Sequence, residues 1–175
     1  MGRLLAARTV GVIGYGRIGR RVARLVSAFG ARALACDATT IGSDAIAEVC
    51  TLDRLLAEAD IVTLHVPSQK SQTHFLDADR IASMKRGAIL VNTARGGLVD
   101  ESALVAALSD GRLSGAAIDT FENEPYTGPL TKLPQVVLTA HMGSYAEEAR
   151  GIMEREAADN LVRALVTHGF MVEPV

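Results

Sequence analysis

The chain has 175 residues, of which 49% are hydrophobic, and a formal net charge of −2 at pH 7. This length corresponds to about one domain with a full core, and the charge excludes the basic surface typical of nucleic-acid-binding domains. No apolar run reaches the roughly 18 residues of a membrane helix. The two cysteines, Cys36 and Cys50, form no CxxC motif, which favours reduced thiols and a cytoplasmic location.

Apolar runs and helical patterns alternate along the chain. Strands are predicted at 9–13, 32–36, 48–50, 60–66, 88–92, 113–118 and 136–138, and a loop at 39–47. Helices are predicted at 17–29, 52–59, 77–84 and 101–109, with a last helix from 144 to about 169. The alternation indicates an α/β fold of Rossmann type: a doubly wound parallel sheet with helices on both faces, in one domain over residues 1–175.

Several helix starts carry capping residues. Thr51 and Asp100 stand at the N-cap positions of the helices at 52–59 and 101–109. Ser144 and Glu147 have the spacing of a capping box, so the last helix is expected to begin there. That helix carries one apolar stripe, formed by Ala149, Ile152, Met153, Ala157, Leu161, Ala164 and Leu165.

The first strand leads into a GxGxxG motif, Gly14 to Gly19, which opens a helix. In this context Gly14 allows a tight turn, Gly16 lets the backbone approach a pyrophosphate, and Gly19 lets the helix pack closely on the strand. Asp37 ends the second strand about 20 residues further on, where an acid binds the adenosine ribose of NAD. No arginine follows Asp37 to receive a 2′-phosphate, so the sequence predicts NAD rather than NADP.

Polar residues follow several predicted strands, at the edge where doubly wound sheets bind ligands. They are Asp37, Arg95, Asp119, Glu124 and His141; each alone is typical of a surface charge or a turn cap, and their joint placement indicates a site. His141 is the best acid–base candidate among the histidines, whereas His65, inside a strand, suits a packed or cofactor-lining role. No histidine pair has metal-ligand spacing, so no metal site is expected.

The segment Asn92–Glu101, NTARGGLVDE, resembles the signature of the D-isomer-specific 2-hydroxyacid dehydrogenases. Four further segments are similar to the same family, phosphoglycerate dehydrogenases included: the preceding MKRGAILV, the LHVP ending at Pro67, Ala117-Ile118-Asp119 and Glu124-Pro125. The resemblance therefore covers nearly the whole chain. The resemblance implies an NAD-dependent oxidoreductase that acts on a D-2-hydroxy acid and its 2-oxo acid, with 3-phosphoglycerate as one candidate substrate.

The resemblance also implies roles for individual residues. Arg95 would bind the substrate carboxylate, His141 would give or take the hydroxyl proton, and Glu124 would orient His141 and favour its charged form. Histidine suits this task because it titrates near neutral pH. The implied cofactor contacts are Arg17 and Ile18 at the pyrophosphate, Val66 and Pro67 at the adenosine, Thr93 and Ala94 at the nicotinamide ribose, Asp119 at the carboxamide, and Gly143 and Ser144 at the nicotinamide end.

Members of the family carry an N-terminal substrate domain, for which the eight residues before Thr9 leave no room. We therefore expect this chain alone to be inactive, because the second domain closes the cleft and excludes water. The resemblance further implies a homodimer through the cofactor domain, with the helix at 101–109 and the loop at 121–134 as interface elements.

Two other interpretations remain open. One is an NAD-sensing or partner-binding module without turnover, similar to the corepressor branch of the family. The other is a Rossmann domain from a different dehydrogenase class, against which the Arg95 signature argues. Whether the chain is an excised domain or a natural short protein is also open.

Overall fold

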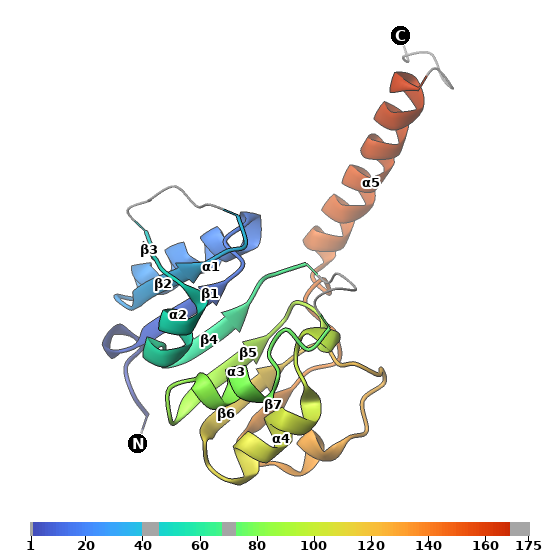
Figure 1. Ribbon diagram of the computed structural model, residues 1–175. Coiled ribbons are helices and arrows are strands. Elements are labelled where there is room, and N and C mark those ends of the chain that lie inside the picture. The colour runs from blue at the N-terminus through green and yellow to red at the C-terminus, as the bar shows by residue number, and fades with distance from the viewer. Residues whose placement is uncertain (1, 40–45, 68–72, 169–175) are drawn as a thin grey trace. The chain divides into compact units, whose positions relative to one another are not determined.

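The computed structural model describes residues 2–39, 46–67 and 73–168. The chain divides into two compact units, Met1–Ala140 and His141–Val175. The first unit holds the sheet and its helices, and the second holds one long helix (Figure 1).

The first unit is built on one parallel sheet. Its strands are β1 (Thr9–Ile13), β2 (Arg32–Cys36), β3 (Glu48–Val49), β4 (Ile61–Leu64), β5 (Ala88–Asn92), β6 (Leu113–Ile118) and β7 (Val136–Leu138). Their order is β3-β2-β1-β4-β5-β6-β7, so the chain winds outward from β1 in one direction and then from β4 in the other. This order confirms the predicted Rossmann-type fold. The strand bounds agree with the prediction except that β3 and β4 are shorter.

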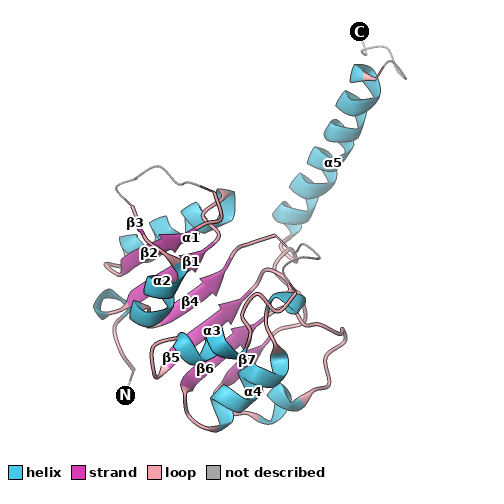
Figure 2. Cartoon of the chain, in the orientation of Figure 1, coloured by secondary structure: helices cyan, strands magenta, loops and turns pink. Residues whose placement is uncertain are grey.

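Helices cover the sheet from both sides. They are α1 (Arg17–Ala28), α2 (Leu52–Glu58), α3 (Ala78–Ser83) and α4 (Glu101–Ser109), with short 3-10 helices at Leu5–Ala7, Gly96–Leu98 and Pro129–Lys132. Helix α1 packs on β1 and β2 on one face, and α2, α3 and α4 lie over the other face (Figure 2). The predicted caps form: the Thr51 hydroxyl accepts from the Arg54 amide, and the Asp100 carboxylate accepts from the Ala103 amide.

Two hydrophobic clusters fill these layers. The larger lies under α2, α3 and α4 and includes Leu55, Leu90 and Leu104. The smaller lies under α1 and consists mostly of valine and alanine, such as Val12 and Ala23. Small side chains in this cluster let α1 lie close to the sheet. The first turn of α1 is thereby placed at the carboxyl end of β1.

The α1 face of the sheet is only partly covered. In β5, Ala88 and Leu90 are buried, whereas Ile89, pointing to the opposite face, is 37% exposed. Val91, Ala117 and Val137 form a line across β5, β6 and β7, and Val137 is 64% exposed. Among the described residues of the first unit, α1 reaches β1 and β2 and leaves this apolar part of the sheet open.

The second unit consists mainly of α5 (Glu147–Thr167). The predicted capping box is wrong: Ala146 is the N-cap, with no side-chain capping bond. The Tyr145 amide instead donates to the Met142 carbonyl oxygen at 2.9 Å, so a turn precedes the helix and delays its start. The apolar stripe of α5 contains no buried residue, and the predicted end near Gly169 lies outside the described residues, as do 40–45 of the predicted loop. Over the described part of the chain, no helix is both long and apolar enough to span a membrane.

Candidate functional site

The glycine motif forms a tight strand-to-helix turn. Gly14 has a φ of 91°, and a Cβ there would lie 2.6 Å from the His65 carbonyl carbon. A Cβ on Gly19 would lie 2.0 Å from the Gly14 carbonyl oxygen, so only glycine lets α1 begin this close to β1. Gly16, by contrast, has open space around its hypothetical Cβ, which suits close approach of a ligand. The tight turn at Gly14 and the close packing at Gly19 are thus present, whereas the contact of Gly16 with a pyrophosphate stays a prediction.

A cavity of about 540 Å³ opens in front of this turn, beyond the carboxyl ends of β1, β4 and β5. It is lined by Gly16, Arg17, Ile18, His65, Val66, Pro67, Thr93, Ala94 and Arg95. The cavity lies where the strand order reverses between β1 and β4, the place at which such sheets bind ligands. Eight of the site residues predicted from the sequence thus line one cavity. His65, predicted to have a packed or cofactor-lining role, lines it as well.

Asp37 lies just after β2, beside the glycine turn. One of its oxygens accepts a hydrogen bond of 2.6 Å from the Tyr15 amide, and the other accepts from the amide and the hydroxyl of Thr39. Burial alone would raise the pKa of Asp37, but these hydrogen bonds outweigh it and hold the pKa below its usual value. The carboxylate is therefore ionised at neutral pH and fixed against the glycine turn.

His65 contributes a neutral ring to the cavity wall. Its Nε2 lies 3.0 Å from the Thr63 hydroxyl oxygen, and burial lowers the pKa of the imidazole. A neutral, packed ring agrees with a lining role rather than proton transfer.

The buried side-chain amide of Asn92 anchors the loop that carries Arg95. The Asn92 side chain donates to the Arg95 carbonyl oxygen at 2.9 Å and accepts from the Ala94 amide at 3.1 Å, and Asn92 is 1% exposed. Gly96 lies so close to the chain at Phe121 that a Cβ would be 1.8 Å from the Phe121 carbonyl carbon. Sequence reasoning missed both residues, although an amide that ends an apolar strand is itself a signal of loop anchoring.

Glu124 lines a different cavity, of about 580 Å³, together with residues such as Tyr126 and Thr139. Its Oε1 accepts a hydrogen bond of 3.1 Å from the Phe121 amide. The rings of Phe121 and Tyr126 stack with centroids 4.4 Å apart and form an apolar wall. Arg95 thus lines the first cavity and Glu124 lines this second one.

Asp119 is almost fully buried at the end of β6. It accepts a hydrogen bond of 2.5 Å from the Thr139 hydroxyl, and its amide donates to the Asn92 carbonyl oxygen at 2.9 Å. These bonds connect the ends of β5, β6 and β7. Thr139 is a further residue that the sequence did not indicate, because its partner lies on another strand.

His141, Gly143 and Ser144 belong to the second unit, in the segment before α5. His141 has a φ of 54°, a left-handed conformation that is uncommon outside glycine. The predicted pairing of Glu124 with His141 stays a prediction. Within the described residues, no group of three or more His, Cys, Asp or Glu side chains is placed to hold a metal ion.

A doubly wound parallel sheet with a glycine turn that opens into a cavity at the strand-order reversal defines a dinucleotide-binding domain. Residues 1–143 match the family model described as D-isomer specific 2-hydroxyacid dehydrogenase, NAD binding domain, and the chain belongs to this family. The resemblance seen in the sequence is thereby confirmed, and NAD is the cofactor of this domain family.

The chain is similar to full-length proteins of this family. It is 42% identical over 160 residues to a glyoxylate reductase of Korarchaeum cryptofilum, covering 89% of this chain and 48% of that protein. It is 40% identical over 168 residues to a D-3-phosphoglycerate dehydrogenase of Mycobacterium bovis, covering 94% and 32%. The chain thus spans half or less of the length of these relatives.

A solved structure also resembles it: a D-isomer specific 2-hydroxyacid dehydrogenase of Lactobacillus delbrueckii ssp. bulgaricus in its NAD complexed form. The TM-score is 0.84 at 35% identity, with 94% of this chain and 55% of that chain covered. The residues around the cavity fit such a cofactor, because Gly16 leaves room for a pyrophosphate and Asp37 is fixed and charged beside the turn.

Proposed function

We propose that this chain is the cofactor-binding part of an oxidoreductase that interconverts a D-2-hydroxy acid and its 2-oxo acid. The observation that carries the proposal is the cavity that joins the glycine turn at Gly16 to the cationic loop at Arg95. A pyrophosphate cradle and a guanidinium at one hollow suit a dinucleotide and a substrate carboxylate bound side by side. When bound, NAD supplies or accepts the hydride.

The residues of this chain supply binding and proton transfer. Arg95 binds the substrate carboxylate, His141 gives or takes the hydroxyl proton, and Glu124 orients His141. Asp119, fixed by Thr139, binds the nicotinamide carboxamide. Arg17 and Ile18 present backbone amides to the pyrophosphate, Val66 and Pro67 line the adenosine side, and Thr93, Ala94, Gly143 and Ser144 surround the nicotinamide ribose and ring.

The substrate class that we propose is a small 2-oxo acid or its D-hydroxy acid, with 3-phosphoglycerate as a candidate. The names of the relatives, a glyoxylate reductase and a D-3-phosphoglycerate dehydrogenase, support this range. Arg95 is exposed on the cavity wall, so turnover requires a second wall that excludes water. We therefore propose that the 175 residues bind NAD but do not turn over substrate by themselves.

We also propose a cytoplasmic location and a homodimer formed through the cofactor domain. Two free thiols support a reducing compartment. The uncovered apolar face of β5, β6 and β7 supports dimerisation, because parallel sheets are normally covered on both faces. Helix α4, the other candidate, already buries Leu104 and Leu108 inside the domain, and the loop at 121–134 buries Leu130.

The experiment that tests this function is calorimetric titration of the purified chain with NADH and, in parallel, with NADPH. We expect NADH to bind more tightly, because the Asp37 carboxylate repels a 2′-phosphate. No binding of NADH would overturn the proposal. A second experiment adds a substrate domain and a 2-oxo acid, and it separates a dehydrogenase from an NAD-sensing module. Oxidation of NADH supports the dehydrogenase, whereas NADH binding without oxidation supports the sensing module.

A further inference from the structure

Two cysteines lie opposite each other where β2 pairs with β3, next to the proposed adenosine site. The parallel register pairs Ala35 with Val49. The Cys50 amide donates to the Ala35 carbonyl oxygen at 2.9 Å, which continues the ladder by one residue. One further step along both strands sets Cys36 opposite Cys50.

The side chains of the two cysteines lie on the same face of the sheet. Both are half-buried free thiols, and both pack against the hydrophobic cluster under α2. Neighbouring strands lie about 4.7–4.9 Å apart, which falls within the Cα–Cα range of about 4.4–6.8 Å found in disulfides. A Cys36–Cys50 disulfide can therefore form with a small local movement.

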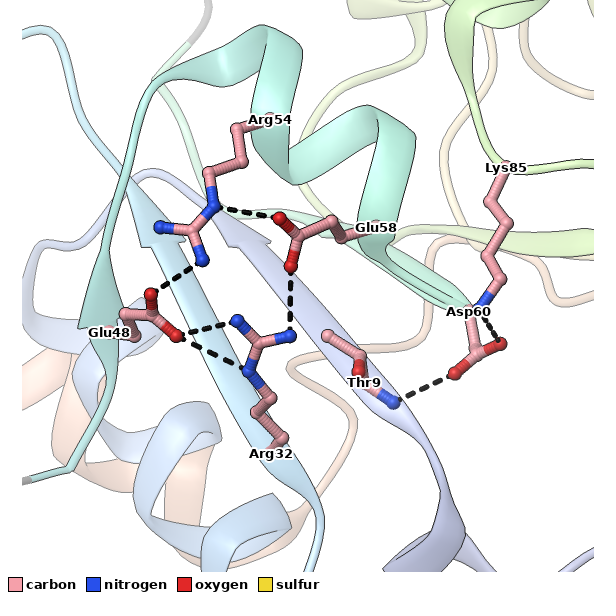
Figure 3. A network of polar contacts seen from close by, with 7 residues as sticks. All are labelled: Thr9, Arg32, Glu48, Arg54, Glu58, Asp60 and Lys85. Atoms are coloured by element: carbon pink, nitrogen blue, oxygen red, sulfur yellow. Dashed lines mark hydrogen bonds and ion pairs between the residues drawn. The ribbon is translucent and has the colours of Figure 1, made fainter.

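Ion pairs join the two strands of this pair to each other and to α2. Glu48, at the start of β3, contacts Arg32 of β2 and Arg54 of α2, each at 2.6 Å, and Glu58 contacts both arginines as well (Figure 3). Such exposed pairs add little stability, but they connect β3 to its two neighbours close to Cys50. The two thiols are thus held in one arrangement.

We propose that Cys36 and Cys50 form a dithiol oxidation site, at which a hydroperoxide converts the two thiols to an intramolecular disulfide. The first thiolate attacks the peroxide, so that an S–O bond forms, the O–O bond breaks, and the leaving alkoxide or hydroxide takes up a proton. The second thiolate attacks the resulting sulfenic sulfur, so that the S–S bond forms and the S–O oxygen leaves as water. Two electrons pass from the thiols to the peroxide.

Either thiol can attack first. Burial raises the pKa of both thiols; Cys50 and Asp37 raise that of Cys36 further, and at Cys50 the Arg54 charge lowers the pKa while Glu48 and Glu58 raise it. The raised pKa values keep the thiolate fraction small at neutral pH and make the first step slow. The second step is intramolecular and is favoured by the proximity of the two residues.

The disulfide acts on the cofactor site through the backbone at the end of β2. The Cys36 carbonyl oxygen accepts from the Gly14 amide at 2.8 Å, and the next residue, Asp37, accepts from the Tyr15 amide. Pulling Cys36 toward β3 displaces Asp37 from the glycine turn. This consequence rests on the proposed NAD-binding function, whereas the formation of the disulfide does not.

The test uses the full chain treated with hydrogen peroxide at mildly alkaline pH, followed by non-reducing peptide mass spectrometry and NADH titration. We expect a cross-linked peptide that contains Cys36 and Cys50, and a mass lower by two hydrogen atoms. We expect the NADH dissociation constant to rise about tenfold, the equivalent of one hydrogen bond to a charged group. Dithiothreitol should reverse both changes.

The matched control is Cys50→Ser, which should bind NADH normally and show no change in affinity on peroxide treatment. Three outcomes would each overturn the dithiol site: sulfinic acids, disulfides between two copies of the chain, or no oxidation of either thiol by peroxide. A mapped Cys36–Cys50 disulfide with unchanged NADH affinity would overturn the coupling to the cofactor. Failure of the reduced chain to bind NADH would instead contradict the proposed function, and the peptide map would still decide the disulfide.

Discussion

At the scale of single residues, Asp37 is fixed beside the glycine turn by its own hydrogen bonds. One carboxylate oxygen accepts from the Tyr15 amide, and the other accepts from Thr39. These bonds hold the pKa of the carboxyl below its usual value, although burial opposes them. The charge is therefore present throughout the physiological range, where it can act on a bound nucleotide as well as on the glycine turn.

We expect Asp37→Asn to weaken NADH binding by about tenfold, since an amide makes weaker hydrogen bonds to the ribose than a carboxylate. NADPH binding should be unchanged or stronger, so that the preference between the two nucleotides narrows. Calorimetric titration of both nucleotides measures this. Asp79→Asn, an exposed acid in α3, is the matched control for the loss of one negative charge. Unchanged NADH affinity in Asp37→Asn would remove the assigned role of the carboxylate.

The residues that sequence reasoning located differ in kind from those that it missed. The glycine turn and Asp37 are determined by a short stretch and one neighbouring strand, so their spacing was sufficient. The support of Asp119 by Thr139 depends on how separate strand ends meet, so nothing local in the sequence determines it. Asn92, by contrast, bonds to residues two and three positions further along the chain, and this local signal was overlooked.

At the scale of secondary-structure elements, alternation of apolar runs and helical patterns was sufficient for the parallel sheet, its strands and four of the helices. It failed at the start of α5, which lies three residues later than predicted, because the Tyr145 amide donates to the Met142 carbonyl oxygen in a turn and Ala146 becomes the N-cap. A polar contact also connects elements that are far apart in the sequence. Asp60 joins the amino ends of β1 and β5 through the Thr9 amide and Lys85, each at 2.9 Å (Figure 3).

The contacts of Asp60 predict that the free energy of unfolding depends on pH. Burial alone would raise the pKa of this carboxyl, but the Thr9 amide, Lys85 and Arg8 together lower it. A carboxyl whose pKa is lower in the folded state stabilises the fold above its unfolded pKa of about 3.9. That contribution disappears as the pH falls through the folded-state pKa.

We therefore expect Asp60→Asn to lower the free energy of unfolding at pH 7 by about 1 to 3 kcal/mol. The difference from the wild type should begin to shrink as the pH falls below about 3.9, where the carboxyl of the unfolded chain takes up a proton, and should vanish below the lower folded-state pKa. Urea denaturation at a series of pH values measures both effects. Glu58→Gln, in the exposed network around Arg32, is the control and should change stability much less. An equal deficit at acidic and neutral pH would contradict the electrostatic account.

At the scale of the whole molecule, the face of β5, β6 and β7 that α1 does not cover is an apolar surface in the described part of the first unit. Val91, Ala117 and Val137 lie in register across three strands, and Ile89 extends the surface along β5. Leaving a parallel sheet face in water costs the hydrophobic free energy that covering it would recover. A second copy of the chain, placed against this face, would recover it for both copies.

We expect the wild-type chain to sediment as a dimer, and Val137→Lys and Ile89→Lys to sediment as monomers. A lysine enclosed in the interface would be a buried unpaired charge, which should weaken dimerisation at least about a hundredfold. Both side chains are exposed in the single chain, so thermal unfolding should show that each variant still folds. The control is Leu25→Lys, an equally exposed leucine on α1, which should remain dimeric. A wild-type monomer at all concentrations would overturn the dimer, whereas a dimer that tolerates lysine at both positions would move the interface to α4 and the loop at 121–134.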